Sequence, residues 1–202
     1  MLITDLTSTN LGDITNCFNA AFSDYIIQFT ATEEYLRNRW EAAGVNFDLS
    51  FGAFIDQKLV GFIIHGVDNW SGLKTAFNVG TGVVPEHRGK KIVKKLYDHS
   101  FPILKSHGIE QCRLEVIQSN EKALRAYKSI GFKEDRELIC FAYKRNQTQH
   151  EISPVKRDQL KIKNNISNVE WNILKTFWDF KPSWENSISC ITRKLDNYQF
   201  FG

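Results

Sequence analysis

The chain has 202 residues, of which 42% are hydrophobic and 24% are charged, and its formal net charge is +3. This length suffices for one compact domain with a small addition, and the composition excludes a wholly disordered or fibrous chain. The small net charge does not by itself indicate a nucleic-acid partner. Four cysteines lack the two-residue spacing of a zinc or redox site. Met1–Leu6 does not begin a signal peptide, and no apolar run reaches the length of a membrane span. We therefore expect a cytoplasmic protein that uses no metal and no membrane.

The first fifth of the chain carries one strand-like run and two helical patterns. Apolar residues recur at helical spacing in the first pattern, and Glu33 and Glu34 favour the first turn of the second. Thr32 is a good N-cap for the second helix, and Gly44 is a stop signal after it. The predicted elements are a strand over Met1–Leu6 and helices over Leu11–Phe22 and Thr32–Ala43.

The pattern then changes to short runs rich in Phe, Val and Ile, which are typical of strands. Asp56-Gln57 and Ser71-Gly72 separate these runs as turns. We predict an antiparallel meander of three strands over 49–55, 59–67 and 75–84.

Helices and strands alternate after the meander. Pro102 is expected to kink the next helix or to end it early, because proline lacks the backbone donor. The predicted elements are a helix over 90–106, a strand over 111–117, a helix over 120–130 and a final strand region over 132–143. This order predicts a mixed α/β (α+β) fold and not an all-parallel doubly wound sheet.

The last part of the chain differs in composition. Residues 145–168 are polar and lysine-rich and are expected to form a linker, whereas 169–202 are aromatic again. Two short motifs occur near both ends of the chain, because Phe22-Ser-Asp-Tyr25 is similar to Phe177-Trp-Asp-Phe180 and Ser50-Phe-Gly52 is similar to Phe200-Phe-Gly202. A second, truncated repeat and a chance similarity of aromatic-rich helices both stay open.

The segment Thr81–Val93 combines a strand end, a basic turn and a helix start. The first N–H groups of a helix have no internal partner, and the helix dipole adds positive charge there, so such an end binds phosphate. Arg88, Lys90 and Lys91 can add charged contacts, and Gly89 removes a side chain where a ligand would approach. An ordinary exposed basic helix start is the alternative, and this segment alone does not decide between them.

This segment resembles the first motif of the GCN5-related N-acetyltransferase (GNAT) superfamily, Val-x-Pro-x-x-Arg-Gly-x-Gly-x-Gly/Ala. The matching residues are Val83, Pro85, Arg88 and Gly89. Lys91 and Val93 stand where the family has small residues, so we expect weakened or reshaped coenzyme A binding. These two departures also support the alternative of a non-catalytic acyl-CoA-binding sensor or pseudoenzyme subunit.

A second stretch is similar to the family's strand, Asn-x-x-Ala helix, Tyr and Gly-Phe ending. The matching residues are Asn120, Ala123, Tyr127, Gly131 and Phe132. Tyr127 lies seven residues after Asn120, which is two helical turns, and therefore shares its face of the helix.

The resemblance implies a GNAT fold over residues 1–148, with a C-terminal extension over 149–202 that opens a second, truncated repeat if the repeat is real. Its central, mostly antiparallel sheet is expected to splay between the fourth and fifth strands, with helices on both sides. The implied activity is direct transfer of acetyl from acetyl-CoA, the cosubstrate, to a primary amine. The acceptor, a small molecule or a peptide, stays open, as does a homodimer, and nucleic acid is not expected.

The resemblance also implies roles for single residues. Tyr127 would protonate the leaving thiolate. Glu115 is the best candidate for the general base, because its Leu-Glu-Val strand resembles the ribosomal-protein alanine acetyltransferase branch. A solvent-facing or lysine-paired glutamate is the alternative, and Asp24, Tyr25 and His65 are other acceptor-side candidates. Coenzyme A is expected to contact Thr81, Gly82, Val83, Arg88, Gly89, Lys90, Lys91, Ile92, Val93 and Asn120.

Overall fold

The computed structural model describes residues 1–141, 162–163, 166–198 and 200–201. The chain divides into two compact units, Met1–Lys133 and Glu134–Gly202, and each is described by itself. The domain boundary expected at residue 148 lies outside the described residues. In the described part of the chain, no helix is long and apolar enough to cross a membrane.

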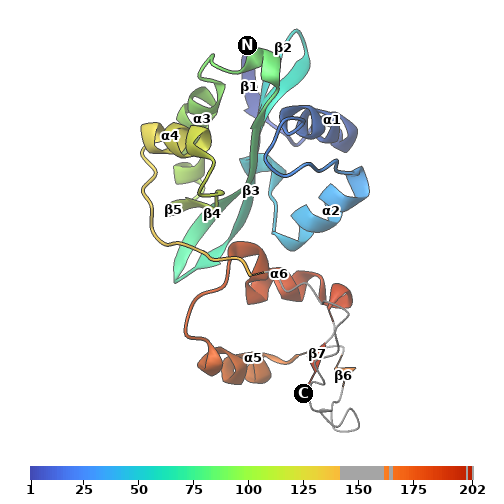
Figure 1. Ribbon diagram of the computed structural model, residues 1–202, viewed down its shortest axis with the longest axis vertical. Coiled ribbons are helices and arrows are strands. Elements are labelled where there is room, and N and C mark those ends of the chain that lie inside the picture. Colours follow the sequence, from blue (N-terminus) through green and yellow to red (C-terminus); the bar gives the residue numbers. More distant parts are fainter. Residues whose placement is uncertain (142–161, 164–165, 199, 202) are drawn as a thin grey trace, which may run out of the picture. The chain divides into compact units, whose positions relative to one another are not determined.

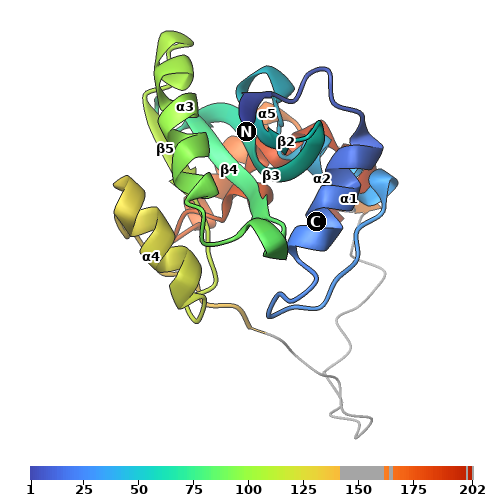
Figure 2. The ribbon, with the colours of Figure 1, turned by 90° about the horizontal axis from the view of Figure 1, so that it is seen from above.

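The first unit is a five-stranded mixed sheet with helices on both faces (Figures 1 and 2). The strand order follows the chain, with antiparallel neighbours up to the fourth strand and a parallel fifth strand. The strands are β1 (Leu2–Asp5), β2 (Phe51–Ile55), β3 (Lys58–Trp70), β4 (Leu73–Val83) and β5 (Gln111–Leu114). Helices α1 (Leu11–Ala21) and α2 (Glu33–Ala42) cover one face, and α3 (Ile92–Ser106) and α4 (Glu121–Ile130) cover the other. The predicted mixed α/β fold is confirmed.

Side-chain caps begin three of these helices. The Asn10 Oδ1 accepts from the backbone N–H of Asp13, the Thr32 Oγ1 from Tyr35, and the Asn120 Oδ1 from Ala123. Each cap satisfies a donor that has no partner within the helix. The predicted caps Thr32 and Asn120 are confirmed.

Strand β4 contains a bulge that decides which side chains share a face. Ile64 of β3 pairs with Gly80, whereas His65 pairs with Asn78, so Val79 is an extra residue in β4. Side chains alternate along a strand, and an extra residue shifts this alternation. Asn78 therefore shares the α3 face of the sheet with Thr81, whose hydroxyl accepts its amide N–H at 2.7 Å.

The glycines of β4 lie on the face of the sheet that α1 covers. A Cβ at Gly82 would lie 2.8 Å from the Cβ of Ala21 and 2.8 Å from the ring of Phe62. The missing side chain lets α1 approach the sheet closely.

Strands β4 and β5 separate after a short paired stretch. Thr75–Asn78 pairs with Gln111–Leu114, and β4 then continues to Val83 without β5. The opposite edge of β4 stays paired with β3 as far as Val83. The predicted splay between the fourth and fifth strands is confirmed.

Three boundaries differ from the sequence-based expectation. Helix α3 begins at Ile92, two residues later than expected, and continues through Pro102 to the expected end at Ser106, so of the two expected effects of Pro102 the early end does not occur. The buried side chains of Leu96 and Leu104 anchor the helix on both sides of the exposed proline. Strand β5 ends at Leu114 and not at residue 117, and residues 132–141 form no strand. The end of that expected strand, 142–143, lies outside the described residues.

The second unit repeats the order strand, helix, helix, strand. It contains β6 (Ile162–Lys163), α5 (Asn168–Leu174), α6 (Ile188–Arg193) and β7 (Phe200–Phe201), and β6 pairs antiparallel with β7. In the first unit, β1, α1, α2 and β2 follow each other in the same order, and β1 likewise pairs antiparallel with β2. Short 3-10 turns complete the two units at Phe47–Leu49, Pro85–His87, Lys175–Phe177, Trp184–Asn186 and Leu195–Asn197.

Candidate active site

The basic turn between β4 and α3 has the geometry of an anion site. Gly89 has φ +74° and Lys91 has φ +57°, so two residues near the turn adopt left-handed conformations. Helix α3 begins without a side-chain cap, in contrast to α1, α2 and α4. The first N–H groups of α3 are therefore left for a ligand, and the helix dipole favours a negative one.

Lys91 and Val93, the two departures from the family motif, have different consequences. A left-handed conformation costs a non-glycine residue about 1–2 kcal/mol, so Lys91 is strained at a position where glycine is free of strain. Val93 packs its side chain against the core cluster on the α3 face, next to buried Ile92. Val93 therefore offers the turn only its backbone N–H group, whereas the Lys91 side chain is exposed at the turn.

Arg88 ties the turn to the loop after α1. Its guanidinium bonds both carboxylate oxygens of Asp24, at 2.6 and 2.8 Å, and the carbonyl oxygens of Ala21 and Val83 at 2.8 and 3.1 Å. These bonds hold the loop after α1 against the end of β4. The coenzyme contact expected of Arg88 stays a prediction. Lys90, the next expected contact, lies with its Nζ 3.3 Å from the Nδ1 of His87.

Four side chains meet at the fork between β4 and β5, and we call Asn78, Thr81, Tyr97 and Tyr127 the fork cluster. The Asn78 Nδ2 lies 2.7 Å from the Thr81 hydroxyl, 2.8 Å from the Tyr97 hydroxyl and 3.4 Å from the Tyr127 hydroxyl. Asn78 pairs with Leu114, the last residue of β5, so the cluster lies where the two strands separate.

The sequence analysis found Tyr127 and Thr81 but missed Asn78 and Tyr97. An asparagine inside an otherwise apolar strand run was the available signal for Asn78, because buried amides need partners. Tyr97 is fully buried and follows Val93 by four residues on the core-facing side of α3. Its position on an apolar helix face gave no signal of a polar role.

The environment of Tyr127 keeps its phenol protonated. Burial raises the pKa of Tyr127, and the nearby phenol of Tyr25 raises it further, whereas hydrogen bonds from Thr81 and Asn78 lower it. The net direction is upward, so at neutral pH the Tyr127 hydroxyl carries its proton. A protonated phenol at the fork can act as an acid.

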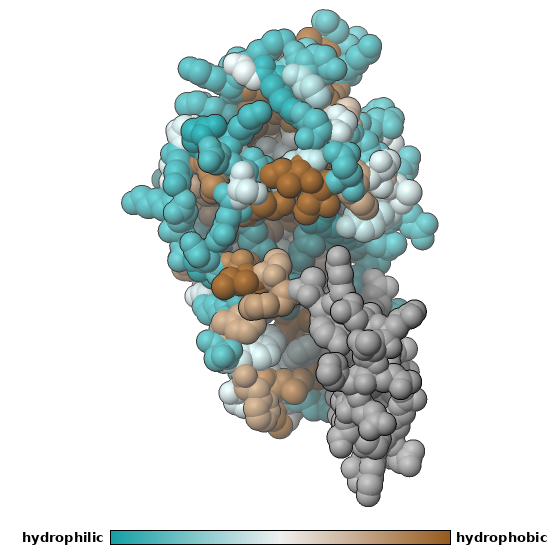
Figure 3. Space-filling model, viewed as in Figure 1, coloured by the Kyte–Doolittle hydropathy of each residue, from teal (hydrophilic) through white to brown (hydrophobic). Residues whose placement is uncertain are grey.

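The loop between α1 and α2 lies opposite α4 and carries acceptor-side candidates. Tyr25 is near enough to Tyr127 to affect its pKa, and the Lys122 ammonium of α4 helps to lower the pKa of Asp24. The larger cause of that lowered pKa is the hydrogen bond from Arg88, which makes Asp24 a weak base. Ile26 and Ile27 follow on the loop and are exposed, and Figure 3 shows a brown patch in this part of the face.

The remaining base candidates differ in access. Glu115 is exposed and lies one residue past the end of β5, beside the fork. His65 is fully buried, and its Nδ1 donates to the Leu49 carbonyl oxygen at 2.6 Å. A buried imidazole cannot reach an incoming amine, so Glu115, whose side chain is exposed, stays the base candidate.

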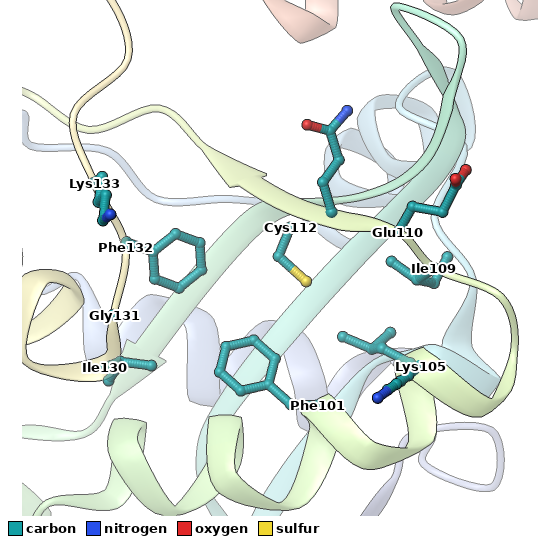
Figure 4. Close-up of a pocket in the computed structure, with 11 residues that line it drawn as sticks. Phe101, Lys105, Ile109, Glu110, Cys112, Ile130, Gly131, Phe132 and Lys133 are labelled. Atoms are coloured by element: carbon teal, nitrogen blue, oxygen red, sulfur yellow. The ribbon is translucent and has the colours of Figure 1, made fainter.

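A cavity of about 700 Å³ lies on the other side of β5, between α3 and the Gly-Phe turn after α4 (Figure 4). The Cys112 sulfur points toward the Phe101 ring, and Ile109, Ile130 and Phe132 complete the apolar part of the wall. None of the expected coenzyme or catalytic residues lines this cavity. We therefore place the candidate active site at the fork.

Comparison with known proteins shows which family the chain matches. The model of the acetyltransferase (GNAT) family matches residues 14–132. A spermidine N(1)-acetyltransferase from Thermoplasma acidophilum is 35% identical over 104 residues, which are 50% of this chain and 62% of that protein. The match thus spans less than two thirds of that relative's length.

Solved structures share the fold at low sequence identity. A ribosomal-protein-alanine N-acetyltransferase from Brucella melitensis biovar Abortus 2308 has a TM-score of 0.56 at 19% identity, covering 71% of this chain and 100% of that one. An aminoglycoside acetyltransferase from an uncultured soil metagenomic sample, in complex with sisomicin, has a TM-score of 0.55 at 19% identity, covering 72% and 96%. The family match covers more than half of the chain and includes both sequence motifs, the basic turn and the fork, and on this ground the chain belongs to the acetyltransferase (GNAT) family.

Proposed function

We propose that this protein is an N-acetyltransferase that moves acetyl from acetyl-CoA to a primary amine by direct attack through a tetrahedral intermediate. The observation that carries the proposal is the fork itself. The edge of β4 free of β5 and the protonated Tyr127 phenol lie at the fork, and the same strand leads through the basic turn to the uncapped start of α3. Membership of the family supports the same activity.

The chain's own groups suit the parts of acetyl-CoA. Beyond Asn78, the β4 edge that faces away from β3 can pair with the pantetheine amides, as an added strand does. The N–H groups at the start of α3, with Lys90 and Lys91, suit the pyrophosphate. A backbone N–H of Thr81–Val83 can support the oxyanion of the tetrahedral intermediate.

The proton steps follow from the same arrangement. The amine attacks in its neutral form, and Glu115 takes up the proton that the amine loses when the N–C bond forms. As the C–S bond breaks, the Tyr127 hydroxyl gives its proton to the coenzyme A thiolate. An α-amino group, with a pKa of about 7.7–8.0, needs less help from a base than a lysine with a pKa of about 10.4.

We propose a primary amine as the acceptor, and the names of the relatives suggest which classes of amine to test. Their names give spermidine, an aminoglycoside and a ribosomal-protein alanine as acceptors. We propose that the loop around Asp24 and Tyr25 contacts the acceptor, because these residues lie opposite α4 and near Tyr127.

We also propose that residues 149–202 open a second acetyltransferase-like repeat. The repeated order strand, helix, helix, strand and the antiparallel pairing of both strand pairs support this proposal.

Acetyl-CoA should stabilise the folded protein. A ligand at 100 times its Kd adds about 2.7 kcal/mol to the free energy of unfolding, which raises the Tm by roughly 5–10 °C for a chain of this size. Thermal melts with and without acetyl-CoA measure the shift. The double variant with Lys90→Glu and Lys91→Glu should lose most of it, whereas Lys105→Glu, near the other end of α3, should keep it. No shift of the wild-type Tm at millimolar acetyl-CoA would refute the proposed function.

Glu115→Gln should shift the acid limb of the pH–rate profile to higher pH if Glu115 is the base. The amide cannot take up a proton, so turnover should fall most at pH values where the amine reaches the site protonated. The measurement is kcat/KM against pH for wild type and variant, with Glu110→Gln at the other end of β5 as the matched control. An unchanged profile would assign proton removal to water.

A further inference from the structure

We propose that Asn78 is the positioning residue for the general acid: its side-chain amide holds the Tyr127 hydroxyl oxygen at the fork and stabilises the phenolate that forms when Tyr127 gives up its proton. This inference rests on the proposed function. It assigns a role to a residue that the family motifs in this chain do not include.

The first support is the geometry around one nitrogen atom. The Asn78 Nδ2 has two N–H groups and three hydroxyl oxygens within hydrogen-bond distance. The bonds to Thr81 and Tyr97 are short, at 2.7 and 2.8 Å, whereas Tyr127 lies at 3.4 Å. Before the reaction, the hydrogen bond from Asn78 to Tyr127 is thus the weakest of the three. The Tyr127 hydroxyl can still donate its own proton to a group at the fork.

The second support is that the backbone fixes Asn78. The residue sits at the end of the β4–β5 pairing and next to the bulge at Val79, and it is paired on its other side with His65. Its side chain is 7% exposed. A buried amide between two paired strands has few alternatives, so its two N–H groups stay within reach of the three hydroxyls.

The third support is the carbonyl oxygen of the same side-chain amide. The Asn78 Oδ1 is buried and has no hydrogen-bond partner among the described residues. A buried acceptor without a partner destabilises the fold, and an apolar side chain of similar shape would avoid this cost. What the amide adds in return is the N–H pair that serves the hydroxyls of the fork cluster.

The contact with Asn78 favours proton transfer from Tyr127 to the coenzyme A thiolate. When the C–S bond breaks, the Tyr127 O–H bond breaks with it, an S–H bond forms on coenzyme A, and a phenolate remains. An N–H donated to an ionised oxygen is shorter and about twice as strong as one donated to a neutral hydroxyl. Asn78 therefore stabilises Tyr127 more after the transfer than before it. The phenolate is then reprotonated by water.

The titratable groups around Tyr127 are few in the described part of the chain. Tyr25 faces it from the loop after α1 and Tyr97 from α3, and Cys112 of β5 lies near Tyr97. Burial raises the pKa of Tyr97 and of Cys112, so both of these groups stay neutral at pH 7. An alkaline limb in the activity profile therefore reports the Tyr127 proton when Tyr127→Phe removes it.

The contact is tested without any acceptor by NMR of protein labelled with carbon-13 at tyrosine Cζ. The Tyr127 and Tyr97 signals are assigned from Tyr127→Phe and Tyr97→Phe. Asn78→Ala should shift both signals, whereas Thr15→Ala, a buried polar change on α1 at the other face of the sheet, should shift neither. If the Tyr127 signal of the folded Asn78→Ala protein does not move, the inference is wrong.

The catalytic part is tested with a double-mutant cycle on kcat, using acetyl-CoA and spermidine or sisomicin. Asn78→Ala should lower kcat about tenfold to a hundredfold, as expected for the loss of a hydrogen bond to a charged group, and leave the KM for acetyl-CoA almost unchanged. The alkaline limb of the pH–rate profile of Asn78→Ala should move to higher pH, because the hydrogen bond from Asn78 lowers the pKa of Tyr127. In the Tyr127→Phe background the same change should have almost no effect, because residues that act as a unit are not additive.

Each outcome separates the two proposals. An equal loss of kcat in both backgrounds would show that Asn78 acts through packing, which overturns the inference and leaves the function in place. If the wild type binds acetyl-CoA but transfers acetyl to neither amine, the proposed acetyl transfer to such amines fails, and the role of Asn78 as an aid to acid catalysis fails with it. Asn78→Asp serves as the second variant, since it keeps the shape and removes both N–H donors; it should also shift the Tyr127 signal and lower kcat.

Discussion

Tyr127→Phe should lower kcat by about 10²- to 10⁴-fold, the range that general acid catalysis contributes. The change removes only the hydroxyl, so the ring keeps its contacts with Tyr97 and Phe132, whose centroids lie 6.4 and 5.7 Å away. Binding of acetyl-CoA should stay close to the wild-type value, because the hydroxyl acts on the leaving sulfur and not on the pyrophosphate. Thiol release measures kcat, and calorimetric titration measures the Kd of acetyl-CoA.

The matched control is Tyr35→Phe, an exposed tyrosine on α2. It should leave kcat unchanged. A Tyr127→Phe protein that turns over as fast as the wild type would show that the thiolate leaves without an acid, and Tyr127 would then be a packing residue. A fall in acetyl-CoA affinity with kcat unchanged would instead assign Tyr127 to binding.

Acid should destabilise the first unit through His65. Burial lowers the pKa of His65 to about 4, although the hydrogen bond with the Leu49 carbonyl works against the shift. Between pH 6.5 and 4 the unfolded chain binds a proton at this residue that the folded chain does not bind. Stability is therefore fully present above pH 6.5 and is lost as the pH falls toward 4, by about 3 kcal/mol at the lower end.

Urea unfolding of the wild type and His65→Asn at several pH values between 7.5 and 4.5 measures this contribution. Carboxylates also titrate in acid, so the informative quantity is the difference between the two curves of unfolding free energy against pH. The difference should grow as the pH falls below 6.5. His107→Asn, at an exposed histidine, should follow the wild type. Parallel curves for wild type and His65→Asn would mean that His65 takes up protons equally well in both states.

Interactions between residues close in the sequence were sufficient to predict many of the helix starts and turns. Thr32 and Asn120 cap helices because their side-chain oxygens reach an N–H three residues on. Asp56-Gln57 and Ser71-Gly72 make turns with positive φ, as the meander required. These features depend on neighbours within a few residues, so a single sequence can reveal them.

The basic turn and Tyr127 were also found from the sequence, because family motifs are contiguous stretches. What the motifs could not show is what their side chains contact. Arg88 bonds Asp24, which is 64 positions away in the chain. This pairing depends on how α1 packs against the end of β4, and no local pattern encodes that distance.

The sequence by itself determined the order of strands and helices as far as α4, the splayed mixed sheet, the basic turn and the acid candidate, since each rests on short-range propensity or a contiguous motif. Only the tertiary structure decided that a bulge at Val79 puts Asn78 and Thr81 on one face with Tyr97 and Tyr127. It also decided that His65 is buried away from the acceptor and that α3 continues through Pro102. The physical reason is common to these cases: burial and side-chain pairing across the sheet are set by residues distant in the chain, and their free energies exceed the local preferences that the sequence displays.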